Sequence, residues 1–278
     1  MKISVSMYSL NSTVQKEKWS IVDFIEYAKS IALDGVELLD FYWSDKEKEL
    51  EETIVALKKH NLAVSAYDVT NDFVKKSIKE RAIEIAKVKD GIQTAKKLGT
   101  NIVRVFSGDL HGELTYEDAQ AWIVEGLKSC AEAAEKEQIY LAIENHGLLA
   151  GKSEQVEEII TKVGSPFVKS TFDTGNFLLV HEEPKHAFDR LKEEVVHVHF
   201  KDFREKDPIE EAVTGFLSTK GVELIGTVPG DGQVNLAYIV QGLKDTNYNG
   251  WLSIEYEGFE DAKVANEEAV NRLRELLK

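Results

Sequence analysis

Four residues of types that bind divalent metal ions stand at the ends of four successive β-rich segments. Three carboxylates and one imidazole together make an oxygen-rich site. Such a site suits Mn²⁺, Mg²⁺ or Co²⁺, whereas a closed zinc site usually has more nitrogen or sulfur donors. A cation held in this way also leaves room for substrate oxygens, so the pattern indicates a catalytic metal site. The four residues are Glu144, Asp173, His199 and Glu255.

The histidine of this set belongs to a segment, residues 195–202, that alternates apolar and polar residues before it ends on Lys-Asp. Side chains two apart on a strand share a face, so His197 and His199 point the same way. His197 lies one layer deeper, and we interpret it as a core residue or a support for a ligand. One acid or histidine in such a place serves as often in an ion pair, but four at the same end of consecutive strands favour a metal.

The elements that must position these side chains alternate between short β-rich runs and longer segments of helical period. Such an alternation, with no linker rich in Pro, Gly or Ser, predicts an α/β fold: a (β/α)8 TIM barrel, as a single domain over residues 1–278. The predicted strands are 3–9, 35–39, 63–67, 101–106, 139–144, 168–173, 195–199 and 251–255, and the predicted helices are 20–33, 46–60, 75–98, 116–136, 153–163, 236–243 and 261–277.

An open doubly wound sheet is the alternative fold. The barrel is favoured because its active-site side chains gather at the C-terminal ends of the strands, where all four ligand candidates fall. Their successive spacings are 29, 26 and 56 residues, and the last exceeds one β/α unit. It includes residues 203–232, which we interpret as a long irregular loop that overhangs the site as a lid.

Composition excludes several classes of function. The net charge of −15 repels polyanions, so nucleic acid is not expected as a partner. No apolar run reaches membrane-spanning length and the start of the chain enters a strand directly, so we expect no membrane contact and a cytoplasmic protein. Cys130 is the single cysteine and has a structural role in a helix. No glycine-rich nucleotide motif follows a strand, so no nucleotide cofactor is expected.

Four motifs resemble those of the xylose isomerase-like barrel superfamily, and more closely its branch of sugar phosphate isomerases and epimerases of the tagatose 3-epimerase type. They arrive in the right order on consecutive strands, and the resemblance covers essentially the whole chain. The motifs are Ile143-Glu144-Asn145-His146-Gly147, Phe172-Asp173-Thr174-Gly175-Asn176, His197-Val198-His199-Phe200-Lys201-Asp202 and Ser253-Ile254-Glu255-Tyr256-Glu257.

The resemblance implies that Glu144, Asp173, His199 and Glu255 hold the metal, with Mn²⁺ preferred and Mg²⁺ or Co²⁺ as alternatives. It also implies that Glu144 and Glu255 form an acid/base pair on either side of the substrate. A metal that chelates two adjacent substrate oxygens would stabilise the enediolate formed when a proton beside a carbonyl is removed.

Further residues are candidates for contact with the substrate. His146 shares a face with Glu144, and Asn176 stands where relatives with an Asp-x-x-His pattern carry a histidine. Arg104 and Lys201 fall at strand ends, where either anchors a carboxylate or phosphate or instead pairs with nearby acids. Aromatic residues near the ends of the early strands would supply an apolar wall for a sugar: Tyr8, Trp43, Tyr67 and Phe73.

The leading functional hypothesis is a metal-dependent isomerase or epimerase of a small sugar, sugar phosphate or keto acid. The alternative is a lyase or dehydratase, which forms the same enediolate and then expels a β-leaving group from a keto-sugar or its glycoside. A barrel that only binds is disfavoured by the paired glutamates, and an endonuclease IV-type enzyme by the charge and by only 7 histidines. Assembly into a homo-oligomer is left open.

Overall fold

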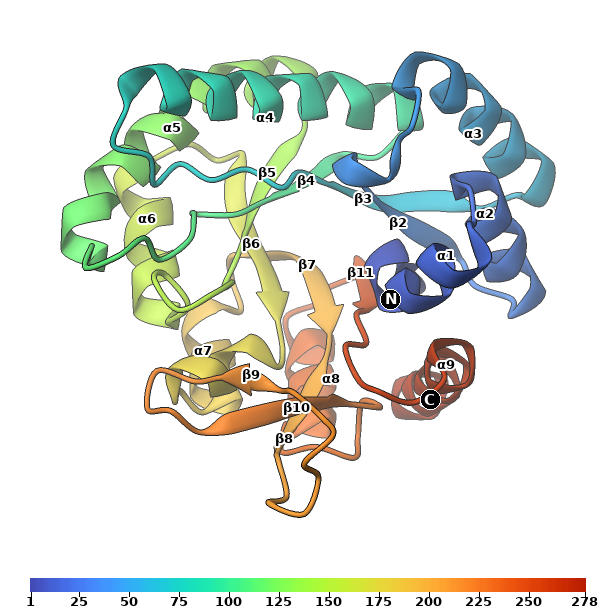
Figure 1. The fold of residues 1–278 in the computed structure, drawn as a ribbon. Helices are drawn as coiled ribbons and strands as arrows, with labels where there is room; N and C mark the ends of the chain where they lie inside the picture. The colour runs from blue at the N-terminus through green and yellow to red at the C-terminus, as the bar shows by residue number, and fades with distance from the viewer.

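A closed barrel of eight parallel strands forms the centre of the computed structural model, which describes residues 1–278 (Figure 1). The strands run round the barrel in the order β1-β11-β7-β6-β5-β4-β3-β2. The predicted TIM barrel is therefore confirmed. The barrel strands are β1 (Lys2–Ser6), β2 (Gly35–Leu39), β3 (Ala63–Asp68), β4 (Ile102–Val105), β5 (Tyr140–Glu144), β6 (Val168–Asp173), β7 (Val195–Phe200) and β11 (Trp251–Ile254).

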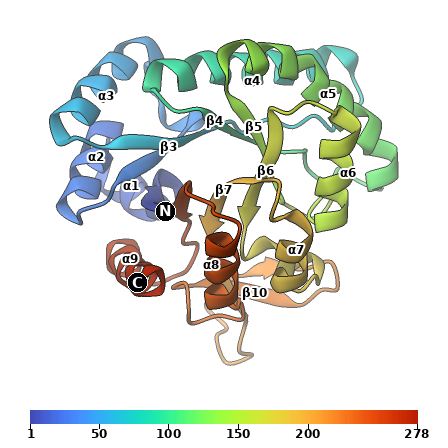
Figure 2. The same cartoon turned by 180° about the vertical axis from the view of Figure 1, so that it is seen from behind.

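Helices surround the barrel on its outer side, as Figures 1 and 2 show from opposite directions. Each helix turns an apolar stripe toward the strands; in α2 the buried stripe is Ile21, Phe24, Ile25 and Ala28, and a capping box at Ser20 begins the helix. The helices are α1 (Asn11–Glu17), α2 (Ile21–Ser30), α3 (Lys46–His60), α4 (Ile78–Leu98), α5 (Tyr116–Glu137), α6 (Ser153–Val163), α7 (Pro184–Leu191), α8 (Leu236–Asp245) and α9 (Ala262–Leu277).

The predicted elements match these bounds closely, with a few differences. No helix was predicted over α1. The first strand ends at Ser6, where the chain enters a short 3-10 helix, η1 (Met7–Leu10). The fourth helix begins at Ile78 and not at residue 75. The sequence reading also placed no helix over α7, which is short and begins with Pro184 at its first position.

The expected irregular loop over residues 203–232 contains short strands, which corrects that prediction in part. It contains a separate antiparallel sheet of β8 (Asp202–Glu205), β9 (Phe216–Leu217) and β10 (Glu223–Thr227). This sheet lies beyond the tips of β6 and β7, at the C-terminal end of the barrel (Figure 1). The Asp202 carboxylate joins this sheet to the turn that follows it. It accepts hydrogen bonds from the backbone N–H groups of Phe203, Gly230, Gly232 and Val234.

Two further features bear on expectations from composition. None of the helices is both long and apolar enough to cross a membrane. Cys130 is fully buried in α5, and burial raises the pKa of its thiol to about 12. A thiol that holds its proton so firmly is a poor nucleophile, which agrees with a structural role for Cys130.

Candidate metal centre and active site

The four predicted metal ligands converge at the C-terminal end of the barrel because β5, β6, β7 and β11 are neighbours. Glu144 and Asp173 are the last residues of β5 and β6, His199 lies in β7, and Glu255 directly follows β11. From the Nδ1 atom of His199, the nearest carboxylate oxygens lie at 3.6 Å in Glu144, 3.8 Å in Asp173 and 3.4 Å in Glu255. All four side chains are buried.

The arrangement fits a divalent cation. The Nδ1 atom of His199 is buried and has no hydrogen-bond partner, although three carboxylates face it. Donor atoms with separations of 3.4 to 3.8 Å leave space for a cation roughly 2.0–2.2 Å from each donor. Buried carboxylates in such number also require positive charge nearby. The residues that would hold the cation are Glu144, Asp173, His199 and Glu255.

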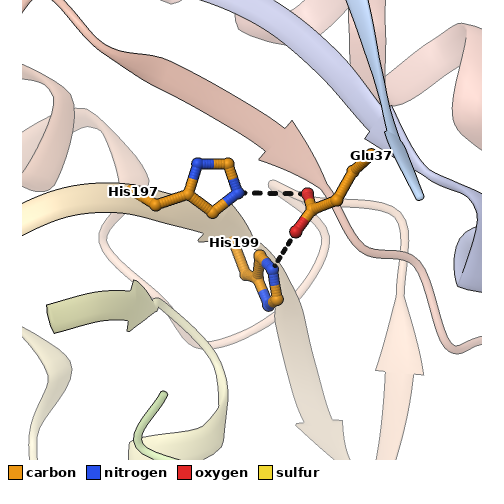
Figure 3. A group of neighbouring side chains, drawn as sticks. All are labelled: Glu37, His197 and His199. Atoms are coloured by element: carbon orange, nitrogen blue, oxygen red, sulfur yellow. Dashed lines mark hydrogen bonds and ion pairs between the residues drawn. The ribbon is translucent and has the colours of Figure 1, made fainter. Parts of the chain in front are cut away.

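The second ring nitrogen of His199, Nε2, contacts Glu37 of β2 (Figure 3). Strands β1 and β11 lie between β2 and β7 in the barrel. One Glu37 oxygen lies 2.8 Å from Nε2 of His199, and the other lies 3.1 Å from Nε2 of His197. All three side chains have no exposed surface. When Nε2–H of His199 donates to Glu37, the lone pair of Nδ1 faces the three carboxylates, which is the orientation that a metal ligand needs.

Two basic residues offset part of the negative charge. Arg104 lies 3.1 Å from Asp68 and 3.2 Å from Glu144. The ammonium of Lys201 lies 2.6 Å from Glu255 and 3.1 Å from Asp173. Both basic residues therefore pair with buried acids. Ion pairs of this kind were one of the two roles expected for them, the other being to anchor a carboxylate or phosphate of the substrate.

These contacts set the ionisation of the acids. Burial opposes ionisation of Glu144, but His199 and Arg104 outweigh it and lower its pKa to about 2. Burial likewise opposes ionisation of Glu255, and Lys201 and His199 reverse this and lower its pKa. For Asp173 burial prevails over Lys201 and raises the pKa to about 6. Burial also prevails in Glu257, 3.4 Å from Lys201, and raises its pKa to about 7.

A cavity of about 220 Å³ opens beside these residues. Four of the predicted substrate contacts line it: Tyr8, Arg104, His146 and Lys201. The fifth, Asn176, does not; it is buried and donates a hydrogen bond to Glu144 at 3.0 Å. His146 stacks on Phe106 with ring centroids 4.0 Å apart, and burial lowers its pKa, which keeps the imidazole neutral at neutral pH.

The apolar wall of the cavity differs from the expected one. Trp43 and Phe73 do not line it, and Tyr67 is buried, where it accepts a hydrogen bond from Trp43. The wall consists of Tyr8, Leu39, Phe41 and Phe106. The strand ends were predicted correctly, but which of the following residues turns inward depends on the local 3-10 turns.

Sequence reasoning missed Glu37 and Glu257 as members of the site. Glu37 is the only charged residue of the run Gly35-Val36-Glu37-Leu38-Leu39, and an acid in a buried strand signals a partner in the core. Glu257 stands in a quoted motif, two residues after Glu255. Residues two apart in an extended segment share a face, as with His197 and His199, so the same pattern would have predicted that Glu257 points toward the site with Glu255.

Comparison with known proteins decides the family. A sequence model of the xylose isomerase-like TIM barrel family matches residues 25–278. This chain belongs to that family. The fold is shared with solved structures at low identity: a D-tagatose 3-epimerase-like protein (TM-score 0.77, 19% identical, 100% of both chains) and the IOLI protein with a bound zinc atom (TM-score 0.77, 20% identical, 99% and 96% of the two chains).

Curated relatives of this family member are more similar in sequence. An inosose dehydratase of Lacticaseibacillus casei is 28% identical over 152 residues, which cover 54% of this chain and 50% of the relative. Inosose dehydratase 2 of Bacillus cereus (strain ZK / E33L) is 26% identical over 245 residues, 86% of this chain and 74% of the relative. The first match thus spans about half the length of the relative.

Proposed function

We propose that this protein is a divalent-metal-dependent dehydratase of an uncharged keto sugar. It removes a proton beside the carbonyl and expels a β-hydroxyl group as water. The observation that carries the proposal is the convergence of three carboxylates on the unpartnered Nδ1 of His199, beside a small cavity that Glu144 and Glu255 line. The relatives named inosose dehydratase support water loss over isomerisation, which was the leading hypothesis from sequence.

The first step needs a base and a means to stabilise negative charge. A divalent cation at these four residues would stabilise the charge that develops on the substrate oxygens. Glu144 and Glu255 line the cavity from different strands, so a ring carbon between them presents a proton to either carboxylate. The electron pair of the broken C–H bond passes to the adjacent carbon and oxygen, which forms an enediolate.

The second step needs an acid for the leaving group. As the enediolate re-forms its carbonyl, its electron pair makes a double bond between the α and β carbons, the β C–O bond breaks, and the departing hydroxyl takes a proton and leaves as water. The carboxylate that removed the first proton releases it to solvent. Glu257 lines the cavity, and its pKa of about 7 leaves a share of the carboxyl protonated at neutral pH. We assign this proton to Glu257, which then regains one from solvent.

Epimerisation or isomerisation is the second candidate. It uses the same first step and is supported by the carboxylates Glu144 and Glu255, which line the cavity from different strands. The fate of the β-hydroxyl separates the two: a dehydratase releases it, whereas an epimerase or isomerase retains it and returns the proton to carbon.

The identity of the metal is a separate proposal. A divalent ion is supported by the donor set. Zinc is bound in the solved structure of the IOLI protein. Mn²⁺ stays a prediction, which rests on the three oxygen donors of the site.

The test is product analysis with the metal-loaded protein. Keto-inositols and 3-keto-hexoses are incubated with protein reconstituted with Mn²⁺, Zn²⁺ or Co²⁺, and products are followed by mass spectrometry and proton NMR. We expect loss of one water from at least one substrate, abolished in Glu144→Gln and Glu255→Gln and retained in the surface control Glu17→Gln. A new isomer of unchanged mass would instead establish the epimerase or isomerase.

A further inference from the structure

A second cavity adjoins the one that holds the candidate metal site. It has a volume of about 290 Å³, and Tyr8 and Glu257 line both cavities, so the two meet at these side chains. Its other walls come from the start of α1, from the segment after β11, and from the lobe formed by residues 202–234, which carries the small sheet β8-β10-β9. The first cavity, at about 220 Å³, is smaller than the roughly 300–1,000 Å³ of sites for drug-sized ligands. It therefore suits one small ring, and a larger ligand would extend into the second.

Every aromatic side chain with high exposure lies at these two cavities. The exposed aromatic residues are Tyr8 (36%), Phe41 (47%), Phe216 (42%) and Phe259 (55%). Tyr8 and Phe41 line the first cavity, and Tyr8, Phe216 and Phe259 line the second. Exposed aromatic rings that gather at one place mark a binding surface, because such apolar area is otherwise left in water. Three of them come from segments far apart in the chain.

The second cavity combines these rings with small neutral polar groups. Asn11 contributes an amide, and Ser12 and Thr214 contribute hydroxyls. The Ser9 hydroxyl is already used within the fold, where it donates to the Ile254 carbonyl and accepts from the Tyr256 N–H. Aromatic faces stack on the C–H faces of a pyranose ring through dispersion, and neutral polar groups hydrogen-bond its hydroxyls. A flat apolar partner would need only the rings, so this mixture favours a sugar.

The charges argue against a phosphate. No lysine, arginine or histidine lines the second cavity, and Glu257 adds a carboxyl group. In the first cavity, Arg104 pairs with Asp68 and Glu144, and Lys201 pairs with Asp173 and Glu255. A phosphate would therefore meet no free basic group and several acids, which repel it.

We propose that the second cavity is a subsite for a second sugar ring, so that the substrate is an uncharged keto sugar carrying a glycosidic ring and not a sugar phosphate. The keto ring occupies the first cavity, and the ring joined to it lies between Phe216 and Phe259 beyond Tyr8. This inference names the substrate class of the proposed dehydratase and rests on that function.

Binding of unreactive sugars tests the subsite without turnover. The metal-loaded protein is titrated with methyl glucosides, with maltose, cellobiose and sucrose as two-ring sugars, and with glucose 6-phosphate, by calorimetry or saturation-transfer NMR. We expect at least one two-ring sugar to bind tenfold or more tightly than methyl glucoside of matching linkage, and glucose 6-phosphate to bind no better than glucose. Equal binding of one-ring and two-ring sugars, or tighter binding of the phosphate, would overturn the proposal.

Variants of the second cavity test whether the tighter binding of two-ring sugars arises there. Phe216→Ala and Phe259→Ala should each remove most of the preference for two rings and leave the affinity for methyl glucoside unchanged. The matched control is Ile78→Ala, which truncates an exposed apolar side chain (74%) on α4 and should change neither. A preference that survives both phenylalanine variants would overturn the placement. Because no reaction is needed, a two-ring preference without water loss would reject the dehydratase and keep the subsite, and water loss from single rings alone would do the reverse.

Discussion

At the scale of single residues, Glu37 decides how the candidate metal centre is oriented. Its two carboxylate oxygens lie within hydrogen-bond distance of Nε2 of both His197 and His199, and the three side chains are fully buried. A carboxylate behind a metal-binding histidine fixes the tautomer and the ring plane. The second histidine restrains the carboxylate itself, so Glu37 has little freedom to turn away.

We therefore expect Glu37→Gln to weaken metal binding by roughly 10–100-fold, the usual effect of losing such a partner. The amide keeps the shape, but it carries no negative charge and turns an NH₂ group toward one of the two imidazoles. Titration with Co²⁺ followed by its visible absorption measures the affinity and reports any change in coordination. Glu17→Gln is the matched control on the surface, and metal affinity within twofold of the parent in Glu37→Gln would contradict this role.

Glu257 separates the two steps of the proposed reaction. As the acid for the leaving group, it acts after the proton beside the carbonyl has been removed. Glu257→Gln should slow water release by about 10²–10⁴-fold, the usual contribution of a general acid. Exchange of the proton beside the carbonyl with D₂O should continue. Loss of exchange and water release together would show that Glu257 acts in the first step.

The convergence of the four candidate ligands could be predicted from the sequence, because each stands at or near a strand end and the barrel brings strand ends together. The sequence did not predict the supporting contacts. Glu37 approaches His199 across the barrel from β2, 162 positions earlier in the chain, and no local pattern records such a distance. For Arg104, pairing with acids was one of two expected alternatives, but its partners Asp68 and Glu144 were not identified, because they lie on the two flanking strands.

At the scale of elements, the sheet β8-β10-β9 forms part of one wall of the second cavity, through Phe216. Asp202 connects it to the barrel, because this carboxylate accepts four backbone N–H groups from Phe203 and from the turn at residues 230–234. Gly232 is required there, since a Cβ atom would lie 2.1 Å from the Asp202 carboxylate. The turn and the carboxylate thus form one unit that sets where the lobe stands.

Asp202→Asn should loosen this lobe. The amide nitrogen would face backbone donors, so one or two N–H groups lose their acceptor, at about 1–3 kcal/mol each. We expect a lower free energy of unfolding in urea and faster hydrogen exchange at Gly230 to Val234. Asp207→Asn, at an exposed turn of the same lobe, should stay within about 0.5 kcal/mol. Unchanged exchange at the turn in Asp202→Asn would be inconsistent with its anchoring role.

The fold itself could be predicted from the periodicity of the chain, since helices such as α2 and α5 carry capping boxes and buried apolar stripes. The small sheet could not. Its strands are two to five residues long, and β8 pairs with β10 across an intervening stretch that includes the two-residue β9. Pairing of such short segments depends on the barrel beneath them more than on their own residues.

At the scale of the whole molecule, the net charge of −15 and the buried acids act in the same direction, because both attract cations and repel anions. The barrel gathers the buried acids Glu144, Asp173 and Glu255 at its C-terminal end, where a divalent cation would offset their charge. Metal binding is therefore coupled to protonation of the same groups.

Metal affinity should fall as the pH falls through about 6. Burial opposes the charge of His199, but Glu255, Glu37 and Glu144 outweigh it and raise its pKa well above the usual value, so in the neutral range a proton on His199 competes with the metal. The pKa of Asp173 is raised to about 6, so below this pH a second proton occupies a carboxylate that the metal needs. Binding should therefore weaken roughly tenfold for each pH unit between 8 and 6, and more steeply below 6. Co²⁺ titrations at pH 5, 6, 7 and 8, with circular dichroism to confirm folding at each pH, measure this. Affinity that is constant from pH 5 to 7 would contradict the coupling.

The most direct test of the central claim is metal-dependent exchange of the proton beside the substrate carbonyl. The protein is incubated in D₂O with an uncharged keto sugar, with and without divalent metal, and the proton signal is followed by NMR. We predict that the signal is lost only in the presence of metal, and that Glu144→Gln and Glu255→Gln prevent the loss. Exchange at the same rate without metal, or exchange that survives in both variants, would contradict the account.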